Sequence, residues 1–220
     1  METTNEFNSC LMLAVNLTTP VDLAYVFDAP DLKDTGIELD SHITILYAQE
    51  KELPRKNIPQ DIRDILGDQE YNDFLDVYCK NTIFHKALDI FDLGSFENDS
   101  DYIILKLKKN FDLFGKLSLI NKGLRVQYSV SSDFDNYTPH VSLAELNPGT
   151  AKKYLESENL KTILEDSYIN FEDIILSYGK SGEPEDRKQY YLTNFKAIDR
   201  YFRIDGLKKT NEEILKEGEK

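Results

Sequence analysis

Two short segments of this chain share one chemical layout. Residues 41–46 read Ser-His-Ile-Thr-Ile-Leu, and residues 139–144 read Pro-His-Val-Ser-Leu-Ala. In each, a His is followed by an apolar residue, a hydroxyl residue and a second apolar residue, and the chain contains only three histidines. This alternation of polar and apolar residues over a short run predicts a half-buried β-strand. Its repetition predicts a pseudo-symmetric α+β fold with one such strand in each half.

Successive side chains of a strand point to opposite faces, so each segment should present its His and its hydroxyl together. The first segment would project His42 and Thr44 from one face, and the second would project His140 and Ser142. Two such strands brought together would line a cleft with two imidazoles and two hydroxyls. One His could act as a general base and the other as a general acid, with the hydroxyls holding an anion between them. Which His takes which role stays open.

A purely structural role is the alternative interpretation for these His and hydroxyl residues. A single His on an alternating strand is more often a hydrogen-bonded structural residue than a catalyst, and Thr and Ser are common in strands or on exposed surfaces. The combination of both segments favours the catalytic reading. The third histidine, His85, has no hydroxyl two residues later, and we expect it to be structural.

The paired His-x-Thr and His-x-Ser segments resemble the signature of the 2H phosphoesterase superfamily. The resemblance covers most of residues 8–204 and implies a two-lobed α+β fold, with antiparallel sheets lining a central cleft and helices outside. It implies a phosphodiesterase whose catalytic residues are His42, Thr44, His140 and Ser142, with no metal and no cofactor. We therefore expect residues 1–204 to form one two-lobed domain and residues 205–220 to form a charged C-terminal tail.

Residues 35–47 are similar to the phage branch of this superfamily that degrades cyclic oligonucleotide signals of CBASS defence. The resemblance thus implies a cyclic oligonucleotide substrate. Two alternatives stay open: a 2′,3′-cyclic phosphodiesterase acting on nucleotides or RNA ends, and a non-catalytic sponge for cyclic nucleotides. A protein-interaction module that keeps the fold is a third. The chain is longer than compact members of the branch, and we expect the extra length near residues 50–88 and in the tail.

Several residues outside the two segments are candidates for substrate binding. Tyr47, Tyr137 and Tyr178 could stack on nucleotide bases, although packing in the core or at a sheet edge is the competing reading for each. Lys180 lies in a Gly-Lys-Ser-Gly segment and could reach a phosphate, unless that segment is an ordinary loop. Phe134 could cover the cleft.

The composition of the chain limits the kinds of molecule that it could bind. The chain carries 26 basic and 40 acidic residues, a net charge of −14. Binding of duplex DNA or long RNA depends on many Lys and Arg contacts to phosphates, so a small nucleotide is the expected substrate. The two cysteines fit no zinc or disulfide spacing, which favours a reducing, cytoplasmic location (the host cytoplasm if the protein is viral). No apolar run could span a membrane and the N-terminus does not resemble a signal peptide. The oligomeric state stays open.

Periodicity predicts the remaining elements. Residues 21–27 could form a short helix or strand, and residues 31–36 a loop. Gly123 is expected to lie at the end of a helix. Thr150 could cap the helix that follows it. The expected strands are 11–17, 42–47, 87–96, 102–107, 137–146, 171–178 and 189–198, and the expected helices are 58–66, 69–78, 111–124 and 150–164.

Overall fold

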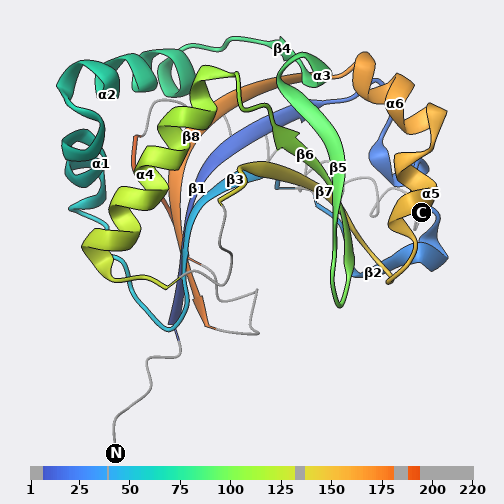
Figure 1. The fold of residues 1–220 in the computed structure, drawn as a ribbon, viewed down its shortest axis with the longest axis horizontal. Coiled ribbons are helices and arrows are strands. Elements are labelled where there is room, and N and C mark those ends of the chain that lie inside the picture. Colours follow the sequence, from blue (N-terminus) through green and yellow to red (C-terminus); the bar gives the residue numbers. More distant parts are fainter. Residues whose placement is uncertain (1–6, 39, 132–136, 181–187, 194–220) are drawn as a thin grey trace, which may run out of the picture.

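The computed structural model describes residues 7–38, 40–131, 137–180 and 188–193. Phe134 and the expected tail at 205–220 lie outside the described residues. Within them, the chain forms one antiparallel sheet with helices packed against it (Figure 1). The α+β class predicted from the sequence is confirmed.

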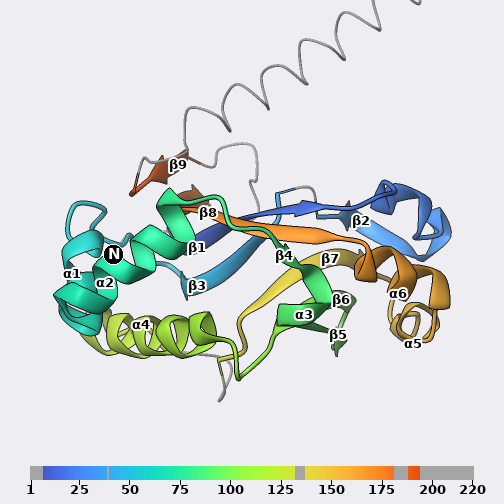
Figure 2. The ribbon, with the colours of Figure 1, turned by 90° about the horizontal axis from the view of Figure 1, so that it is seen from above.

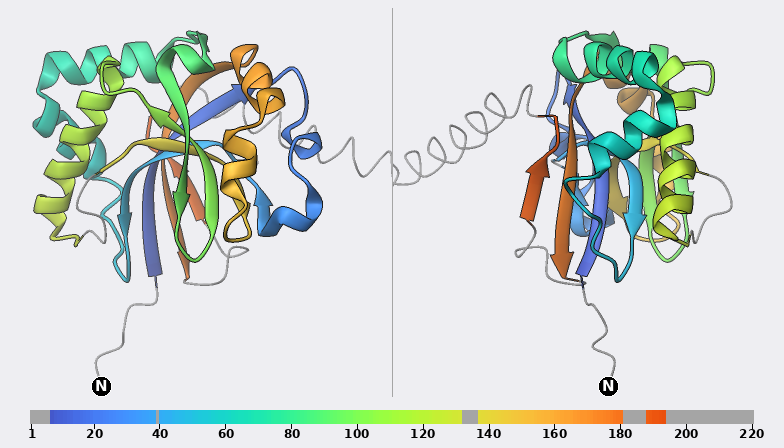
Figure 3. Two further views of the ribbon diagram at one scale, coloured as in Figure 1. Left: turned by 45° about the vertical axis from the view of Figure 1, so that its right-hand side comes forward. Right: turned by 90° about the vertical axis from the view of Figure 1, so that its left-hand side faces the viewer.

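The sheet has nine strands in the described residues, in the order β4-β8-β1-β3-β7-β6-β5, with β2 beside β7 and β9 beside β8. All of the strand pairs are antiparallel. Figure 3 shows how strongly the sheet twists and curls. The strands are β1 (Phe7–Thr18), β2 (Leu32–Ile37), β3 (His42–Ala48), β4 (His85–Lys86), β5 (Phe91–Glu97), β6 (Asp101–Leu107), β7 (His140–Leu146), β8 (Tyr168–Lys180) and β9 (Lys188–Tyr191).

The helices gather at the two ends of the sheet, with α1, α2 and α4 at one end and α5 and α6 at the other (Figure 2). None of the helices in the described ranges is long and apolar enough to cross a membrane. The helices are α1 (Ile58–Leu66), α2 (Asp68–Leu75), α3 (Ala87–Ile90), α4 (Asp112–Tyr128), α5 (Ala151–Leu155) and α6 (Glu158–Glu165). Short helical turns lie between β1 and β2, at Leu23–Tyr25 and Ala29–Asp31, and directly after α2, at Asp76–Lys80.

The sheet consists of two matching halves that meet at its centre. One half is β8-β1-β3 and the other is β5-β6-β7, and the central strands β3 and β7 are paired through Ile43 and Val141. The two lobes expected from the sequence are therefore the halves of one continuous sheet. This arrangement puts the two His-containing strands next to each other, although many residues separate them in the chain.

The main hydrophobic core lies on one face of the sheet. Leu11 and Leu13 of β1 are fully buried there, and α4 covers β3 with four buried residues one or two turns apart. Burial of each such side chain stabilises the fold by about 1.5–3 kcal/mol. The four residues of α4 that are buried against the sheet are Leu113, Leu117, Ile120 and Leu124.

On the opposite face, the described residues form a small separate cluster of Met12, Ala14 and Ile175. Both histidines of the repeated segments lie on this side. We call it the histidine face.

Several expected elements differ from the observed ones. The expected loop at 31–36 contains strand β2, because residues 32–37 pair with the edge of β7. The first part of the expected strand 87–96 is the helical turn α3, and the strand begins at Phe91. The expected glycine end of the helix at 111–124 is wrong, since α4 continues past Gly123 to Tyr128 and ends at Ser129 in a left-handed conformation.

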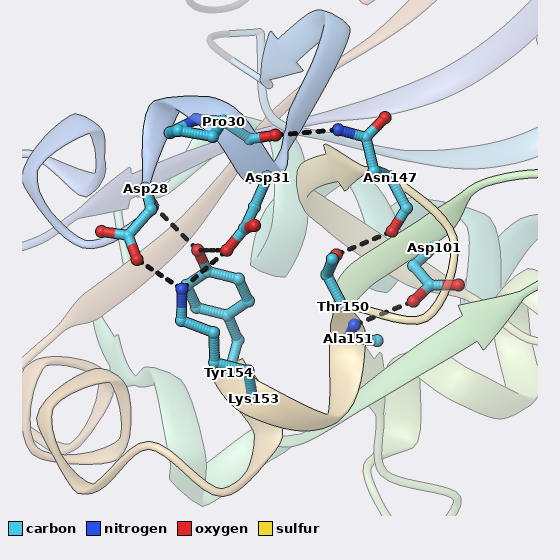
Figure 4. Close-up of polar contacts among 9 residues, drawn as sticks. All are labelled: Asp28, Pro30, Asp31, Asp101, Asn147, Thr150, Ala151, Lys153 and Tyr154. Atoms are coloured by element: carbon cyan, nitrogen blue, oxygen red, sulfur yellow. Dashed lines mark hydrogen bonds and ion pairs between the residues drawn. The ribbon is translucent and has the colours of Figure 1, made fainter.

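The expected single helix at 150–164 is two helices. Ser157 interrupts it, because its hydroxyl accepts the backbone N–H of Leu160 and starts α6. Thr150 occupies the N-cap position of α5, as predicted, but its hydroxyl donates to the carbonyl of Asn147 at 2.7 Å and makes no capping bond to the helix. Asp101 of β6 instead accepts the backbone N–H of Ala151 at 2.8 Å (Figure 4).

The segment where extra length was expected, residues 50–88, forms α1, α2, the turn at Asp76–Lys80 and β4. Helix α1 packs against α4, the turn at Asp76–Lys80 packs against β8, and β4 pairs with β8. His85 lies here, with its ring edge-on to Phe111 at 5.4 Å and away from the histidine face, as expected for a structural residue.

Candidate active site

The two His-containing strands have nearly identical burial along their length. In β3, His42 and Thr44 are half-buried while Ile43 and Ile45 are fully buried. In β7, His140 and Ser142 are half-buried while the residues that follow each of them are buried. The alternation predicted from the sequence is thus present in both strands, with each His and its hydroxyl on the same face.

The pairing of β3 with β7 brings the four polar side chains together. Ile43 lies opposite Val141 in an antiparallel register. One residue to either side of this pair, the same register sets His42 across from Ser142 and Thr44 across from His140. The two histidines also interact electrostatically, because the charge of His42 contributes to lowering the pKa of His140. The structure therefore supports the predicted grouping of two imidazoles and two hydroxyls.

Each His strand carries a β-bulge at the same place, three residues after its His. The register of β3 against β1 skips Ile45, and that of β7 against β6 skips Leu143. An extra residue of this kind bends the strand and shifts the alternation by one. After the bulges, Tyr47 lies opposite Cys10 and Glu145 lies opposite Tyr102, both on the histidine face. Simple alternation would have turned Tyr47 into the core.

The two imidazoles are oriented in the same way. Nδ1 of His42 lies 2.7 Å from the carbonyl oxygen of Asp40, and Nδ1 of His140 lies 2.8 Å from that of Thr138. A carbonyl oxygen can only accept, so Nδ1 is the donor in both rings and carries the proton. The neutral form of each ring therefore leaves Nε2 free to take a proton, and the charged form can give one from Nε2.

The surroundings of His140 favour its neutral form. Burial is the largest cause that lowers its pKa below the ordinary 6.5, and the charges of His42 and Lys106 lower it further. The hydrogen bond to the Thr138 carbonyl acts in the opposite direction but is outweighed. The ring of Phe96 packs edge-on against the imidazole, with centroids 4.8 Å apart. At neutral pH, His140 is thus suited to accept a proton.

The floor around the four polar residues is mostly apolar. On the β1 side, Met12 lies beside Thr44 and Ala14 lies beside His42. On the β6 side, Ile104 lies beside Ser142 and Lys106 lies beside His140. Apart from Lys106, these neighbours are buried. A site with such walls strengthens the electrostatic interactions of any anion held between the hydroxyls.

The four candidates for substrate binding have different positions. Tyr47 is 50% exposed on the histidine face and lines a polar depression with Lys51 and Ser129, and its role in base stacking stays a prediction. Tyr178 lies opposite the buried Ser9 on the other face, where its hydroxyl donates to the Leu53 carbonyl. The register gives its predicted role no support.

Tyr137 joins the two His strands. Its hydroxyl donates to the backbone carbonyl of Thr44 at 2.9 Å, across from the segment that leads into His140. Burial raises its pKa strongly, so the hydroxyl keeps its proton and stays a donor. Tyr137 thus connects the two His strands, and its contact with substrate stays a prediction. For Lys180, only the backbone pairing with Phe7 lies within the described residues.

Sequence reasoning missed Phe96 and Lys106 on β5 and β6, and Asn121 on α4. Both strands were predicted, and the alternation of β6 shows which residues share a face with Lys106. Nothing in the sequence indicates that β6 lies next to the second His strand. Within the described residues, no group of three or more His, Cys, Asp or Glu side chains could hold a metal ion.

No protein-family model matches the chain, and no curated protein matches it. Several solved structures are similar in overall arrangement. One is described as a phosphoesterase, with 10% identity and a TM-score of 0.42 over 83% of this chain and 95% of that chain. Another is Usb1 from Kluyveromyces marxianus, with 12% identity and a TM-score of 0.37 over 87% and 99% of the two chains.

A third is LigT from E. coli in its apo form, with 11% identity and a TM-score of 0.40 over 84% of this chain and 94% of that chain. Kluyveromyces marxianus Usb1 is matched again in a structure with uridine monophosphate. The chemistry depends on the side chains that this chain places on the histidine face.

Proposed function

We propose that this protein is a phosphodiesterase of the 2H type that cleaves a small nucleotide by general acid–base catalysis. The observation that carries the proposal is the repeated arrangement about the Ile43–Val141 pair: on each side, a His with Nδ1 bound to a backbone carbonyl and a hydroxyl two residues later. A structural His has no need of a symmetry-related partner with the same free nitrogen. Two proton-transfer groups flanking an anion site are suited to phosphodiester cleavage by general acid–base catalysis.

The proposed reaction breaks one P–O bond and forms another. The oxygen of water or of a ribose 2′-OH attacks phosphorus while Nε2 of one neutral His takes its proton. The other His, in its charged form, gives a proton from Nε2 to the oxygen that leaves. Thr44 and Ser142 donate hydrogen bonds to the non-bridging oxygens, where negative charge increases.

For the substrate, we propose a cyclic oligonucleotide of the kind used as a host-defence signal. Three properties favour a compact nucleotide over a long nucleic acid: the net charge of −14, the apolar floor of Met12, Ala14 and Ile104, and the exposed aromatic ring of Tyr47. A 2′,3′-cyclic phosphate, on a nucleotide or RNA end, is the alternative substrate within the same chemistry.

A panel assay after treatment with a chelator tests the proposal. Purified protein would be incubated with cyclic di- and trinucleotides and with 2′,3′-cyclic mononucleotides, and the products identified by chromatography and mass. We expect cleavage that survives chelation and that falls at least about 100-fold in each of His42→Ala and His140→Ala, the usual contribution of one acid or base. His85→Gln, which changes the third histidine away from the site, is the matched control and should keep full activity.

The outcomes separate the candidate functions. Cleavage of cyclic mononucleotides alone would replace the cyclic oligonucleotide with the alternative substrate. Tight binding of a nucleotide that is recovered unchanged, and that persists in His42→Ala, would indicate a sponge instead of an enzyme. Cleavage that needs an added divalent ion would contradict the proposed mechanism.

A further inference from the structure

Among the residues of β1 and β6 that lie beside the two His-hydroxyl pairs, one position differs in charge. Residues that flank the His strands correspond in register: Met12 and Ile104 lie beside the two hydroxyls, and Leu13 and Leu105 lie beside the central pair. The next position is Ala14 beside His42 but Lys106 beside His140. The repeated arrangement is therefore broken by a single cation, on the β6 side.

The Lys106 side chain is held in place by β5. It lies across Gly94, where a Cβ would come within 2.9 Å of its Cε and 3.0 Å of its Nζ. Its ammonium lies 5.3 Å from the centre of the Phe96 ring, the ring that also packs against His140. A cation at this distance is attracted by the face of an aromatic ring. Gly94 and Phe96 thus hold the ammonium in place on the histidine face.

Among the residues that the structure describes, no carboxylate forms an ion pair with Lys106. Asp92 lies opposite Lys106 in the register of β5, but its carboxylate pairs with Lys108 at 3.8 Å. In a chain of net charge −14, a lysine beside a candidate catalytic group that pairs with no carboxylate of the described residues calls for a functional explanation.

We infer that Lys106 is a positioning residue that makes the two histidines unequal, so that His140 acts as the base and His42 acts as the acid. The inference rests on the proposed function and gives the reaction a direction. The attacking oxygen would lie on the side of β5 and β6, and the leaving oxygen on the side of β1 and β8.

The charges around His140 all act in the same sense. His42 faces it from β3 and Lys106 faces it from β6, both as cations or potential cations, while Phe96 from β5 is uncharged. Only the Thr138 carbonyl favours the protonated ring. A neighbouring cation disfavours a second positive charge, so His140 keeps its Nε2 lone pair for the nucleophile's proton. His42 has Ala14 in the corresponding position.

The direct test follows the titration of the three histidines by NMR in the absence of substrate. Their Hε1 signals would be assigned with single His→Gln variants and followed across the imidazole range, about pH 5 to 8. In Lys106→Met, which keeps the length of the side chain, we expect the pKa of His140 to rise. Lys106→Arg should keep it low, because the charge is retained. His85 lies on the core side and serves as the internal reference that should not move.

The kinetic test uses the same variants. The acidic limb of kcat/KM reports the base of the free enzyme, so it should move to higher pH in Lys106→Met and return in Lys106→Arg. Lys106→Gln provides a second neutral variant should the Met variant fold poorly.

An unchanged His140 titration in both neutral variants would overturn the inference, as would a shift of the alkaline limb in place of the acidic one. Absence of any turnover by the wild-type protein would instead overturn the proposed function. Without turnover, His140 could not be assigned as the general base, even if its titration still responded to Lys106. The two failures are thus distinguished by different measurements.

Discussion

At the scale of single residues, the site depends on side chains that fix others in place. Tyr137 was a candidate for base stacking, yet its hydroxyl is bound to the Thr44 carbonyl. That hydrogen bond connects the segment entering β7 with the middle of β3, so it fixes the distance between the two His-hydroxyl pairs. The two backbone carbonyls that bind Nδ1 fix the imidazoles in the same way. General acid–base catalysis depends on such geometry before it depends on pKa.

Tyr137→Phe tests the role of this hydrogen bond between the two His strands. The ring stays, and only the hydrogen bond to Thr44 is lost, so we expect the free energy of unfolding to fall by about 0.5–1.5 kcal/mol and kcat to fall with it. Urea unfolding and steady-state kinetics measure the two effects. Tyr25→Phe is the matched control, because the ring of Tyr25 is 83% exposed. Loss of substrate affinity with no change in kcat or stability would instead favour direct contact with the nucleotide.

At the scale of elements, helix α4 supports the bulge in β3. The bulge leaves the backbone of Ile45 out of the regular register with β1, and the buried side chain of Asn121 donates to its carbonyl at 2.7 Å. A buried carbonyl without a partner is costly, so this contact stabilises the irregular strand. Since the bulge sets the face on which Tyr47 lies, α4 contributes to the site without lining it.

Asn121→Leu tests this role. The substitution keeps a similar size but removes the donor to Ile45, and we expect it to lower the free energy of unfolding by about 1–3 kcal/mol. Lys122→Leu changes the exposed neighbour in the same helix, and its effect should stay within about 0.5 kcal/mol. Chemical denaturation of both variants gives the comparison. Equal stability of Asn121→Leu and the wild-type protein would show that the bulge needs no support from α4.

At the scale of the whole molecule, contacts between distant parts of the sequence hold the half that contains β7. Lys153 of α5 pairs with Asp31 at 2.7 Å and also with Asp28 (Figure 4). The hydroxyl of Tyr154 donates to Asp31 at 2.8 Å and accepts the backbone N–H of Asp28. These contacts fasten the segment before β2 to the helix after β7.

This cluster predicts a pH dependence of stability. The hydrogen bonds from Lys153 and Tyr154 hold the pKa of Asp31 below its ordinary 3.8. A carboxyl with a lowered pKa stabilises the fold above its unfolded-state value and loses that contribution as the pH falls through its folded-state value. Asp31→Asn should therefore lower the melting temperature at pH 7, and the difference should shrink below about pH 3.8. Thermal unfolding across this range measures it.

The control for that prediction is Glu165→Gln, which removes one negative charge from an exposed position at the end of α6. It should change the melting temperature little at either pH. If Asp31→Asn lowered the melting temperature equally at pH 7 and at pH 3, the contribution of Asp31 would have to come from packing, since its charge would make no difference.

The sequence by itself determined the pair of His-hydroxyl segments, the shared face of each pair and the α+β class. These are local properties, because side-chain alternation has a period of two residues and shows in any short strand. It also located most strands and helices, since amphipathic periodicity is local too. It failed where a partner far along the chain decided the outcome. The edge of β7 makes β2 a strand, and Asp101 of β6 accepts the backbone N–H of Ala151 at the start of α5.

Only the tertiary structure decided how the two segments meet and how they differ. The pairing of Ile43 with Val141, the bulges at Ile45 and Leu143, and the position of Lys106 beside His140 all depend on strand order. Strand order results from the packing of the whole core, in which no single stretch of residues carries the information. The same holds for Tyr178, whose face follows from the register of β8 with β1. The sequence therefore specified the chemical groups of the site, and the fold specified their neighbours.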